Sequence, residues 1–262
     1  MANMTSSVSA SQVAGELASA TFEEIPALVE HYREDPRQQV IKACERALKR
    51  HAKELAERER VNDMYELMHE LGGDGVVVGV DEVGRGSVAG PLTVCAVCLP
   101  MEPRVWGIND SKKLTPARRE LLSVKIAEVA TAIGFCHIVP KDIDEMGMAR
   151  AIRAAVVGAV ADTGLEPDCV LMDGNPLGAV PNERDVVKGD AKIACIAAAS
   201  IMAKVTRDEM MVEYDAEYPE YHLAESKGYA SPEHIEAIRK HGLCPLHRVS
   251  FCGNFLQTER LF

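Results

Sequence analysis

Hydrophobic positions follow two different periods along the chain, and the change comes near residue 72. Residues 22–71 interleave Leu and Ala with charged side chains, and their apolar positions are sparse. This spacing predicts a long amphipathic helix or helical hairpin, with Asp35 as the cap before Pro36. A solvated helix packed on the main domain is the preferred interpretation, and a contact with a partner or a nucleic acid is the alternative.

The ends of this helical segment define the expected parts of the chain. Residues 1–21 are small and polar and lack the basic and apolar regions of a signal peptide, so we expect them to be disordered. Gly72 to Gly75 (GGDG) ends the helix and marks a boundary. We therefore expect a helical extension over residues 22–72 and a single globular domain over residues 73–262.

The remainder of the chain alternates short β-branched runs with longer helical patterns. Four runs predict buried strands, and the short gap between the first two predicts antiparallel neighbours: VVVGV (76–80), PLTVCAVCLP (91–100), IGFCHIVP (133–140) and PDCVLM (167–172). Helical patterns follow over residues 116–132, 143–162 and 192–218, and Ser231–Pro232–Glu233 opens a last helix that ends at Gly242. This order predicts an α/β fold with a mixed sheet flanked by helices.

Composition narrows the class of protein. The chain has 262 residues, of which 47% are hydrophobic and 26% charged, and no apolar run approaches the roughly 20 residues that span a bilayer. We expect a cytoplasmic protein that is monomeric and does not contact a membrane. The net charge of −11 argues against a nonspecific nucleic-acid binder but leaves room for a local basic patch beside an acidic metal centre.

The eight cysteines lie mostly in apolar surroundings. Cys95 and Cys98 form a C-x-x-C inside a strand-like run, with no second pair at zinc spacing. Small buried side chains in a reducing compartment are the preferred interpretation, and a metal or disulfide role is the alternative.

Carboxylates follow the apolar runs. VVVGV leads into Asp81 and Glu82, CVLM leads into Asp173, and VVKG precedes Asp190. A carboxylate at the end of a buried strand is costly unless it is paired or binds a metal, although Asp173 followed by glycine is also a common turn. Several such acids without ligand histidines favour a hard cation, Mg²⁺ or Mn²⁺, over zinc.

The stretch after the first acids is rich in glycine. Adjacent strand residues point to opposite faces, so Asp81 and Glu82 share one site only if the strand ends or bends there, which Gly84 and Gly86 would permit. The spacing G-R-G-S-V-A-G is neither G-x-G-x-x-G nor a P-loop, and a strand follows it rather than a helix. We expect a loop whose bare backbone lets a ligand approach closely, with Arg85 available to a phosphate or hydroxyl group.

Several motifs, in order over about residues 74–255, resemble ribonuclease HII, the type 2 ribonuclease H family. They are GVDEVGRGSVAGPLTVCAV (79–97), INDSKKLTPARRE (108–120), LMDGN (171–175), KGDAKIACIAAASIMAKVTRDEMM (188–211), KGYASPEHIEAIRKHG (227–242) and LCPLHRVSF (243–251). One departure is Ser87, where the family commonly has proline after glycine–arginine–glycine. The helical segment resembles an extension of some bacterial members.

The resemblance implies a ribonuclease H-like fold and a metal-dependent endonuclease. Such enzymes cut the RNA strand of RNA–DNA hybrids and cut 5′ of ribonucleotides embedded in duplex DNA, leaving a 3′-hydroxyl and a 5′-phosphate. The implied metal-binding and catalytic residues are Asp81, Glu82, Asp173 and Asp190. Gly84, Arg85 and Gly86 would read the 2′-hydroxyl, and Tyr229 would stack at the RNA-to-DNA junction.

These roles are chemically consistent. Two divalent ions can hold the attacking water and the leaving oxygen in line, and four carboxylates can carry both ions, so no acid needs to be a dedicated general base. Only the 2′-hydroxyl distinguishes RNA from DNA in the sugar. The expected phosphate donors lie on a loop and on one face of the long helix: Asn109, Ser111, Lys112 and Lys113, then Ser200, Lys204 and Arg207.

Two other functions compete with this hypothesis. A ribonuclease HIII would carry a β-rich N-terminal domain, whereas this segment is helical and the tyrosine of KGY fits HII better. A non-catalytic nucleic-acid-binding relative would not need the complete carboxylate set.

The C-terminal segment has two features of its own. His247 and Arg248 are interpreted as a structural tie of the tail to the domain. For the last residues, where Gln257 precedes Leu261 and Phe262, a frayed tail is preferred over a sliding-clamp contact.

Overall fold

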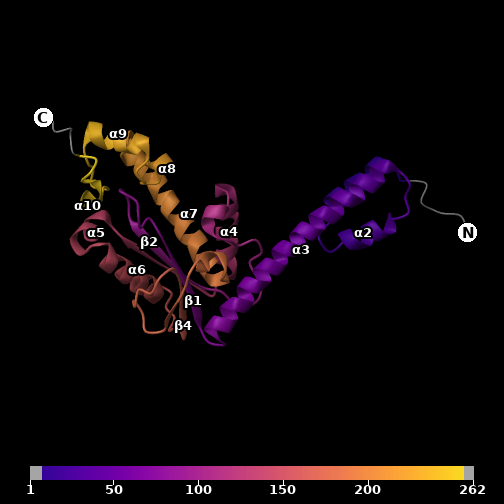
Figure 1. The fold of residues 1–262 in the computed structure, drawn as a ribbon, viewed down its shortest axis with the longest axis horizontal. Helices are drawn as coiled ribbons and strands as arrows, with labels where there is room; N and C mark the ends of the chain where they lie inside the picture. The colour runs from indigo at the N-terminus through magenta and orange to yellow at the C-terminus, as the bar shows by residue number, and fades with distance from the viewer. Residues whose placement is uncertain (1–7, 257–262) are drawn as a thin grey trace, which may run out of the picture. The chain divides into compact units, whose positions relative to one another are not determined.

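A computed structural model describes residues 8–256, and the expected clamp-binding tail (Gln257, Leu261, Phe262) lies outside them. The chain divides into two compact units, Met1–Asn62 and Asp63–Phe262. The division falls ten residues earlier than the expected boundary at residue 72, because one helix, α3 (Gln38–Gly72), contributes to both units (Figure 1). Among the described residues, none of the helices is both long and apolar enough to cross a membrane.

The first unit is built from α1 (Ala10–Ser19), α2 (Ile25–His31) and the first part of α3. We expected residues 1–21 to be disordered, but α1 is a regular helix. Its N-terminus has a reciprocal cap, in which the Ser9 hydroxyl accepts from the Gln12 N–H and the Gln12 side chain accepts from the Ser9 N–H. The expectation missed this cap.

The apolar residues of the first unit form a small core of their own, made of Val13, Leu17, Ile25, Val40, Ala43 and Ala47. Arg50 joins α3 to the end of α1 by donating to the carbonyls of Leu17 and Ala20, at 3.0 and 2.7 Å. The predicted helix from residue 22 is interrupted between α2 and α3, and the Asp35 carboxylate accepts from the Arg37 N–H at 3.0 Å just before α3 begins.

The second unit contains a five-stranded mixed sheet in the order β3-β2-β1-β4-β5. Its strands are β1 (Val77–Val83), β2 (Leu92–Cys98), β3 (Ala132–Ile138), β4 (Cys169–Asp173) and β5 (Glu183–Val186). The strands β1, β2 and β3 pair antiparallel, which confirms the expected β1–β2 hairpin, whereas β4 pairs parallel with both β1 and β5. Strand β5 was not among the predicted strands, because ERDV has no apolar run.

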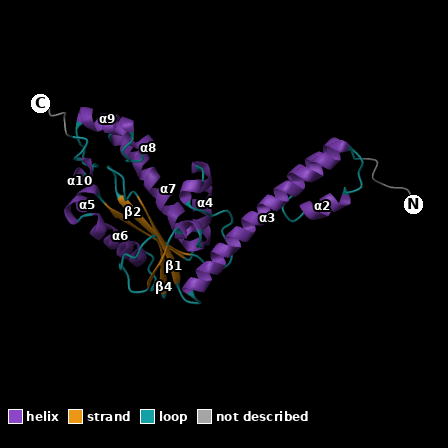
Figure 2. Cartoon of the chain, viewed as in Figure 1, coloured by secondary structure: helices purple, strands orange, loops and turns teal. Residues whose placement is uncertain are grey.

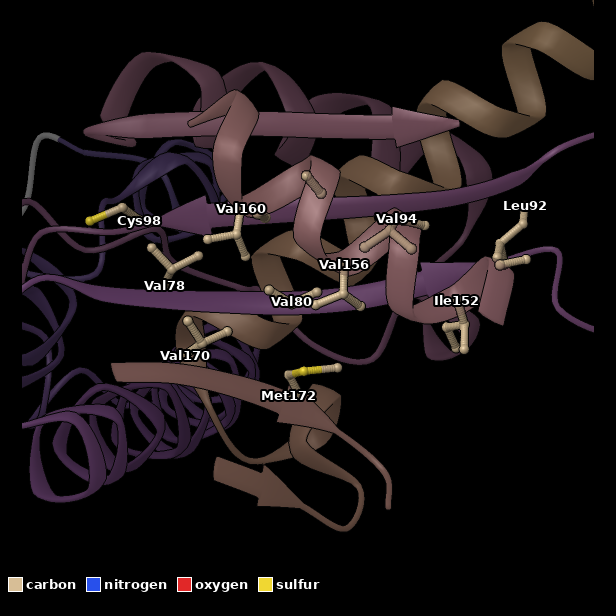
Figure 3. Packing of buried hydrophobic residues seen from close by; sticks show 14 of the residues in the cluster. Val78, Val80, Leu92, Val94, Cys98, Ile152, Val156, Val160, Val170 and Met172 are labelled. Carbon is tan, nitrogen blue, oxygen red and sulfur yellow. The ribbon is translucent and has the colours of Figure 1, made fainter. Parts of the chain in front are cut away.

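Helices cover both faces of this sheet (Figure 2). On one face α6 (Met148–Asp162) packs over β1, β2 and β3, and Ile152, Val156 and Val160 interdigitate with Val78 and Val80 (Figure 3). The predicted helix over residues 143–162 is two helices, α5 (Pro140–Met146) and α6, because Gly147 has a φ of +79° between them.

The opposite face is covered by α7 (Ala194–Glu217), whose buried residues include five alanines. A Cβ at Gly79 of β1 would lie 2.3 Å from the backbone carbon of Cys195, so only glycine permits this close approach. The shorter elements around this frame are α4 (Pro116–Val129), α8 (Leu223–Ser226), α9 (Pro232–His241) and α10 (Val249–Cys252), with 3-10 turns η1 (Ser111–Lys113), η2 (Gly189–Ala191) and η3 (Pro219–Tyr221).

Most of the cysteines are buried, as expected. All eight are free thiols, and five of them are buried. Cys95 and Cys98 lie in β2, where they contribute apolar volume.

Candidate active site

Two of the predicted acids meet because their strands are parallel neighbours. The register pairs Val80 of β1 with Met172 of β4, and the next residues along are Asp81 and Asp173. The carboxyl ends of β1 and β4 therefore bring these side chains to one edge of the sheet.

Asp81 is the most enclosed of the acids, with 7% of its surface exposed. Burial raises the pKa of its carboxyl well above the ordinary value, and the charges of Glu82 and Asp173 raise it further. The Ser200 hydroxyl on α7 hydrogen-bonds to this carboxylate and lies 2.9 Å from the Ser111 hydroxyl. Asp81 therefore lies on the face of the sheet that α7 covers, the same face as Gly79.

Glu82 points to the other face of β1. The strand neither ends nor bends at this residue, because Glu82 still pairs with Val94 and the ladder continues to Val83. Burial raises the pKa of the Glu82 carboxyl, the nearby Arg85 guanidinium opposes the shift, and the charge of Asp173 adds to it. Glu82 is thus electrostatically coupled to the other acids, although its strand turns it away from Asp81.

Asp190 is brought to Asp173 by the turn η2. The Gly189 N–H donates to the Asp173 carboxylate at 2.7 Å, and Lys188 precedes it in a left-handed conformation with φ of +58°. Burial raises the pKa of the Asp190 carboxyl, and the charges of Asp173 and then Asp110 raise it further. Three strand and turn ends thus converge on one acidic region.

Asp110 is the acid that sequence reasoning missed. Its carboxylate accepts from the Lys112 N–H at 2.9 Å and begins η1. Burial lowers the pKa of Lys112, but this is outweighed by the charges of Asp81, Asp190, Asp110 and Asp173, which raise it. The available signal was the pattern N-D-S-K, in which an aspartate caps a turn beside predicted phosphate donors.

Chemically these side chains suit a divalent metal ion, since the four predicted acids offer only oxygen atoms and repel one another. Among the described residues, however, no three Asp, Glu, His or Cys side chains are gathered closely enough to hold an ion as they stand. The donor chemistry and the mutual repulsion therefore fit a cation, and coordination requires the carboxylates to draw together around it.

The glycine loop (residues 84–91) follows β1. Gly84 has a φ of +85°, and a Cβ there would lie 2.3 Å from Nε of Arg207 and 2.8 Å from the Pro91 carbonyl oxygen. No heavy atom lies within 4 Å of a Cβ built on Gly86, and the Arg85 side chain is 61% exposed. The Ser87 hydroxyl donates to the Gly84 carbonyl at 2.9 Å. The loop is thus packed against the protein at Gly84 and open to solvent at Arg85 and Gly86.

Arg207 was expected to contact phosphate, and the structure contradicts this. Its side chain is fully buried beneath the glycine loop. It donates to the carbonyls of Pro91, Ala89 and Lys227 at 2.8 to 3.0 Å, and to the Ser87 hydroxyl at 2.9 Å. The i, i+4, i+7 spacing correctly placed Arg207 on the face of α7 that carries Ser200 and Lys204, but that spacing does not distinguish a solvent-facing position from one under a loop.

The other expected phosphate donors differ in how open they are. Ser111 and Ser200 are buried against each other, so they support Asp81 rather than face solvent. Lys204 donates to Asp208 at 2.7 Å, and both side chains are 18% exposed. Lys113 is 59% exposed.

Asn109 is the remaining predicted donor of this group. Its side-chain oxygen accepts from the Asp110 N–H at 2.9 Å. Arg85, Lys112 and Lys113 are therefore exposed among the predicted contacts.

The predicted tie at the C-terminal side is confirmed. Arg248 is fully buried and donates to the Gly90 carbonyl at 2.9 Å and to the Arg85 carbonyl at 3.2 Å. His247 pairs with Ala89 in an isolated β-bridge. Both residues therefore bind backbone groups of the glycine loop.

Comparison with known proteins gives a consistent assignment. The family model for ribonuclease HII matches residues 78–254, and that for the ribonuclease HII N-terminal domain matches residues 9–71. The chain is 44% identical over 204 residues to ribonuclease HII of Ruminiclostridium cellulolyticum, covering 77% of this chain and 80% of that protein. It is 41% identical over 224 residues to ribonuclease HII of Geobacillus thermodenitrificans, covering 85% and 86%.

A solved structure agrees with this assignment. The crystal structure of ribonuclease H2 from Pyrococcus horikoshii superposes with a TM-score of 0.59 at 27% identity, over 70% of this chain and 99% of that one. The second unit therefore has the ribonuclease H type 2 fold expected from the sequence. With its catalytic part and its N-terminal part both matched by models of one family, the chain belongs to the ribonuclease HII family, the endonucleolytic type 2 ribonucleases H.

Proposed function

We propose that this enzyme hydrolyses the RNA strand of RNA–DNA hybrids and cuts 5′ of ribonucleotides embedded in duplex DNA, leaving a 3′-hydroxyl and a 5′-phosphate. The observation that carries the proposal is the placement of Asp81 beside Asp173 at the ends of parallel strands, with Asp190 brought to them by η2. Membership of the ribonuclease HII family supports the substrate class.

Asp81, Glu82, Asp173 and Asp190 are the residues proposed to hold Mg²⁺ or Mn²⁺, two ions in the working site. Such ions lower the pKa of bound water and stabilise the charge that develops on the leaving oxygen. The protein's own contribution is to hold the carboxylates at one edge of a rigid sheet. Ser200 and Gly189 orient Asp81 and Asp173 by hydrogen bonds, which limits how far these two acids must move when the four draw together around a cation.

The glycine loop is proposed to read the 2′-hydroxyl. At Gly86 no side chain stands between the backbone and an approaching sugar, and Arg85 extends from the loop into solvent, whereas Gly84 is needed because a Cβ there would collide with Arg207. Tyr229, 39% exposed, presents a flat ring that would stack on a deoxyribose and clash with an added hydroxyl. Lys113, Lys112 and Asn109 are proposed to contact backbone phosphates, which adds affinity but no base preference.

The test is a duplex DNA with one embedded ribonucleotide, incubated with the protein and Mg²⁺ or Mn²⁺, with products sized on a denaturing gel. We expect one cut immediately 5′ of the ribonucleotide and none in the all-DNA duplex of the same sequence. Cleavage of long hybrids but not of the single ribonucleotide would contradict the junction-specific part. Folded protein that cuts neither substrate with either ion would favour the non-catalytic relative.

A further inference from the structure

The backbone beside Tyr229 is pressed against the glycine loop. Gly228 has a φ of +77°, and a Cβ there would lie 2.2 Å from the Ala89 carbonyl oxygen. The Gly228 carbonyl accepts from the N–H groups of Val88 and Ala89, at 2.9 and 3.0 Å. The Tyr229 ring itself is 39% exposed, with the Arg207 guanidinium carbon 5.8 Å from its centroid. The direction of the ring therefore depends on what holds the Tyr229 backbone.

One of those supports is His234, which lies fully buried on α9. Its Nδ1 is 2.9 Å from the Tyr229 carbonyl oxygen. A carbonyl only accepts, so Nδ1 must carry the proton of the neutral ring. The second ring nitrogen, Nε2, is then left as an acceptor.

The acceptor of His234 meets a second buried histidine. Its Nε2 is 3.1 Å from Nε2 of His247, so His247 must carry its proton there. The Nδ1 of His247 is consequently an acceptor, and it lies 3.0 Å from the Cys244 N–H and 3.2 Å from the Cys244 Sγ. One set of tautomers therefore satisfies every link from Cys244 to the Tyr229 carbonyl.

This chain of hydrogen bonds, the histidine relay (Cys244, His247, His234 and the Tyr229 carbonyl), closes on the glycine loop. The backbone of His247 forms a β-bridge with Ala89, the residue whose N–H binds the Gly228 carbonyl. The relay thus joins the segment that carries Tyr229 to the far end of the loop that carries Gly84 and Gly86.

We propose that His234 is a positioning residue, whose Nδ1–H fixes the Tyr229 ring relative to the glycine loop and so sets the preference for a single embedded ribonucleotide over a long hybrid, and that His247 acts by fixing the tautomer that places the proton on that nitrogen. The inference rests on the proposed function, since it takes Tyr229 to be the group that reads the junction. Neither histidine touches the reacting atoms. Their effect is on which substrate fits, because a junction reader that tilts loses its contact with the next sugar.

The test compares two substitutions, each of which keeps a different one of the two hydrogen bonds made by the His234 ring. In His234→Asn the amide N–H replaces Nδ1–H and keeps the bond to the Tyr229 carbonyl, whereas in His234→Gln the amide oxygen replaces Nε2 and keeps the bond to His247. Each variant loses one link, so their melting temperatures should be similar. The readout is the ratio of kcat/KM for the single-ribonucleotide duplex to kcat/KM for the long hybrid.

We expect His234→Gln to lower this ratio by about 10-fold or more, and His234→Asn to stay within about 3-fold of the parent enzyme. The matched control is His241→Gln on the same helix, an exposed position at which the ratio should not change. A purely structural role would lower activity on both substrates together and leave the ratio unmoved. Equal ratios in His234→Asn and His234→Gln would overturn the proposal.

Two further measurements separate the relay from the role of Tyr229. Imidazole ¹⁵N shifts of the full chain should show Nδ1–H for His234 and Nε2–H for His247, and any other pair of tautomers would overturn the relay whatever Tyr229 does. Tyr229→Ala should lower the same ratio. If it does not, junction reading by Tyr229 fails and the inference falls with it, while the carboxylate assignment stands.

Discussion

Two regions of buried charged residues adjoin the glycine loop, and they differ in whether the protein itself stabilises the charge. Beneath the loop, the buried Arg207 and Arg248 donate hydrogen bonds to loop carbonyls and need no carboxylate partner. At the strand ends, Asp81 and its neighbours are enclosed, alike in charge and mutually destabilising. The buried guanidinium groups have their hydrogen-bond partners within the protein. The charge of the acidic region, by contrast, is neutralised only when it binds a cation.

The largest effect should come from removing one acid. Asp173→Asn should reduce cleavage by on the order of 10³-fold, because the carboxylate proposed to hold a metal ion is lost. The melting temperature should not fall, since an amide oxygen can still accept from Gly189 and one repelling charge is gone. Gel assays and thermal melts of the same preparations check both parts. A strongly destabilised variant would show that the acids stabilise the fold instead.

The second effect concerns the region beneath the loop. Arg207→Met should destabilise the protein by about 3 kcal/mol or more, because it leaves several buried acceptors without a donor. Urea unfolding measures the loss, with Arg239→Met on the exposed side of α9 as the control that should change little. Stability equal to the parent would mean that the loop does not depend on this guanidinium.

A smaller effect separates the buried histidines from the acids by pH. Burial and the neighbouring His234 lower the pKa of His247 to about 4 in the folded state. The unfolded chain then binds a proton more readily, with a pKa of about 6.5. The contribution of His247 to the free energy of unfolding is therefore fully present above pH 6.5, and about 2 kcal/mol of it is lost as the pH falls toward 4. His247→Gln should flatten this part of the curve in urea titrations between pH 4 and 7.

The smallest expected effect is a loss of stability as the pH rises, opposite in direction to that of His247. Burial and then the charge of Glu183 raise the pKa of Asp185 on β5 to about 6, and its Oδ1 is a buried atom without a hydrogen-bond partner. The unfolded carboxyl ionises near pH 4, so stability falls as the pH rises from about 4 to 6, by about 1 kcal/mol because the group is only partly enclosed. Asp185→Asn should remove this slope in thermal melts, and an unchanged slope would contradict the assignment.

The comparison also separates what the sequence could predict from what it could not. The acids were found because a carboxylate after an apolar run is unusual, and parallel pairing of β1 with β4 then brings Asp81 to Asp173. Arg207 was misjudged because helical spacing identifies a face but not what covers it. The strand β5 was missed because its residues are polar and its place in the sheet comes from pairing with β4 alone.

The histidine relay lay beyond sequence reasoning for a related reason. His234 and His247 are thirteen residues apart, on a helix and on the segment beyond it, and neither has a motif of its own. Their pairing depends on how α9 folds back, which is a property of tertiary packing. By contrast, the start of α9 next to Ser231 was predicted correctly, because it depends only on neighbouring residues, and the Ser231 hydroxyl caps the helix there.

The bridge between Ala89 and His247 has a consequence for the order of events during synthesis. All four predicted metal-binding acids leave the ribosome well before Arg248, which holds the glycine loop through Gly90 and Arg85. The residues of the sheet and of the acidic edge are therefore complete while the loop proposed to read the sugar still lacks the hydrogen bonds of Arg248. If the loop reads the 2′-hydroxyl as proposed, a chain that lacks Arg248 would carry the four acids without the hydrogen bonds that support the loop selecting the substrate.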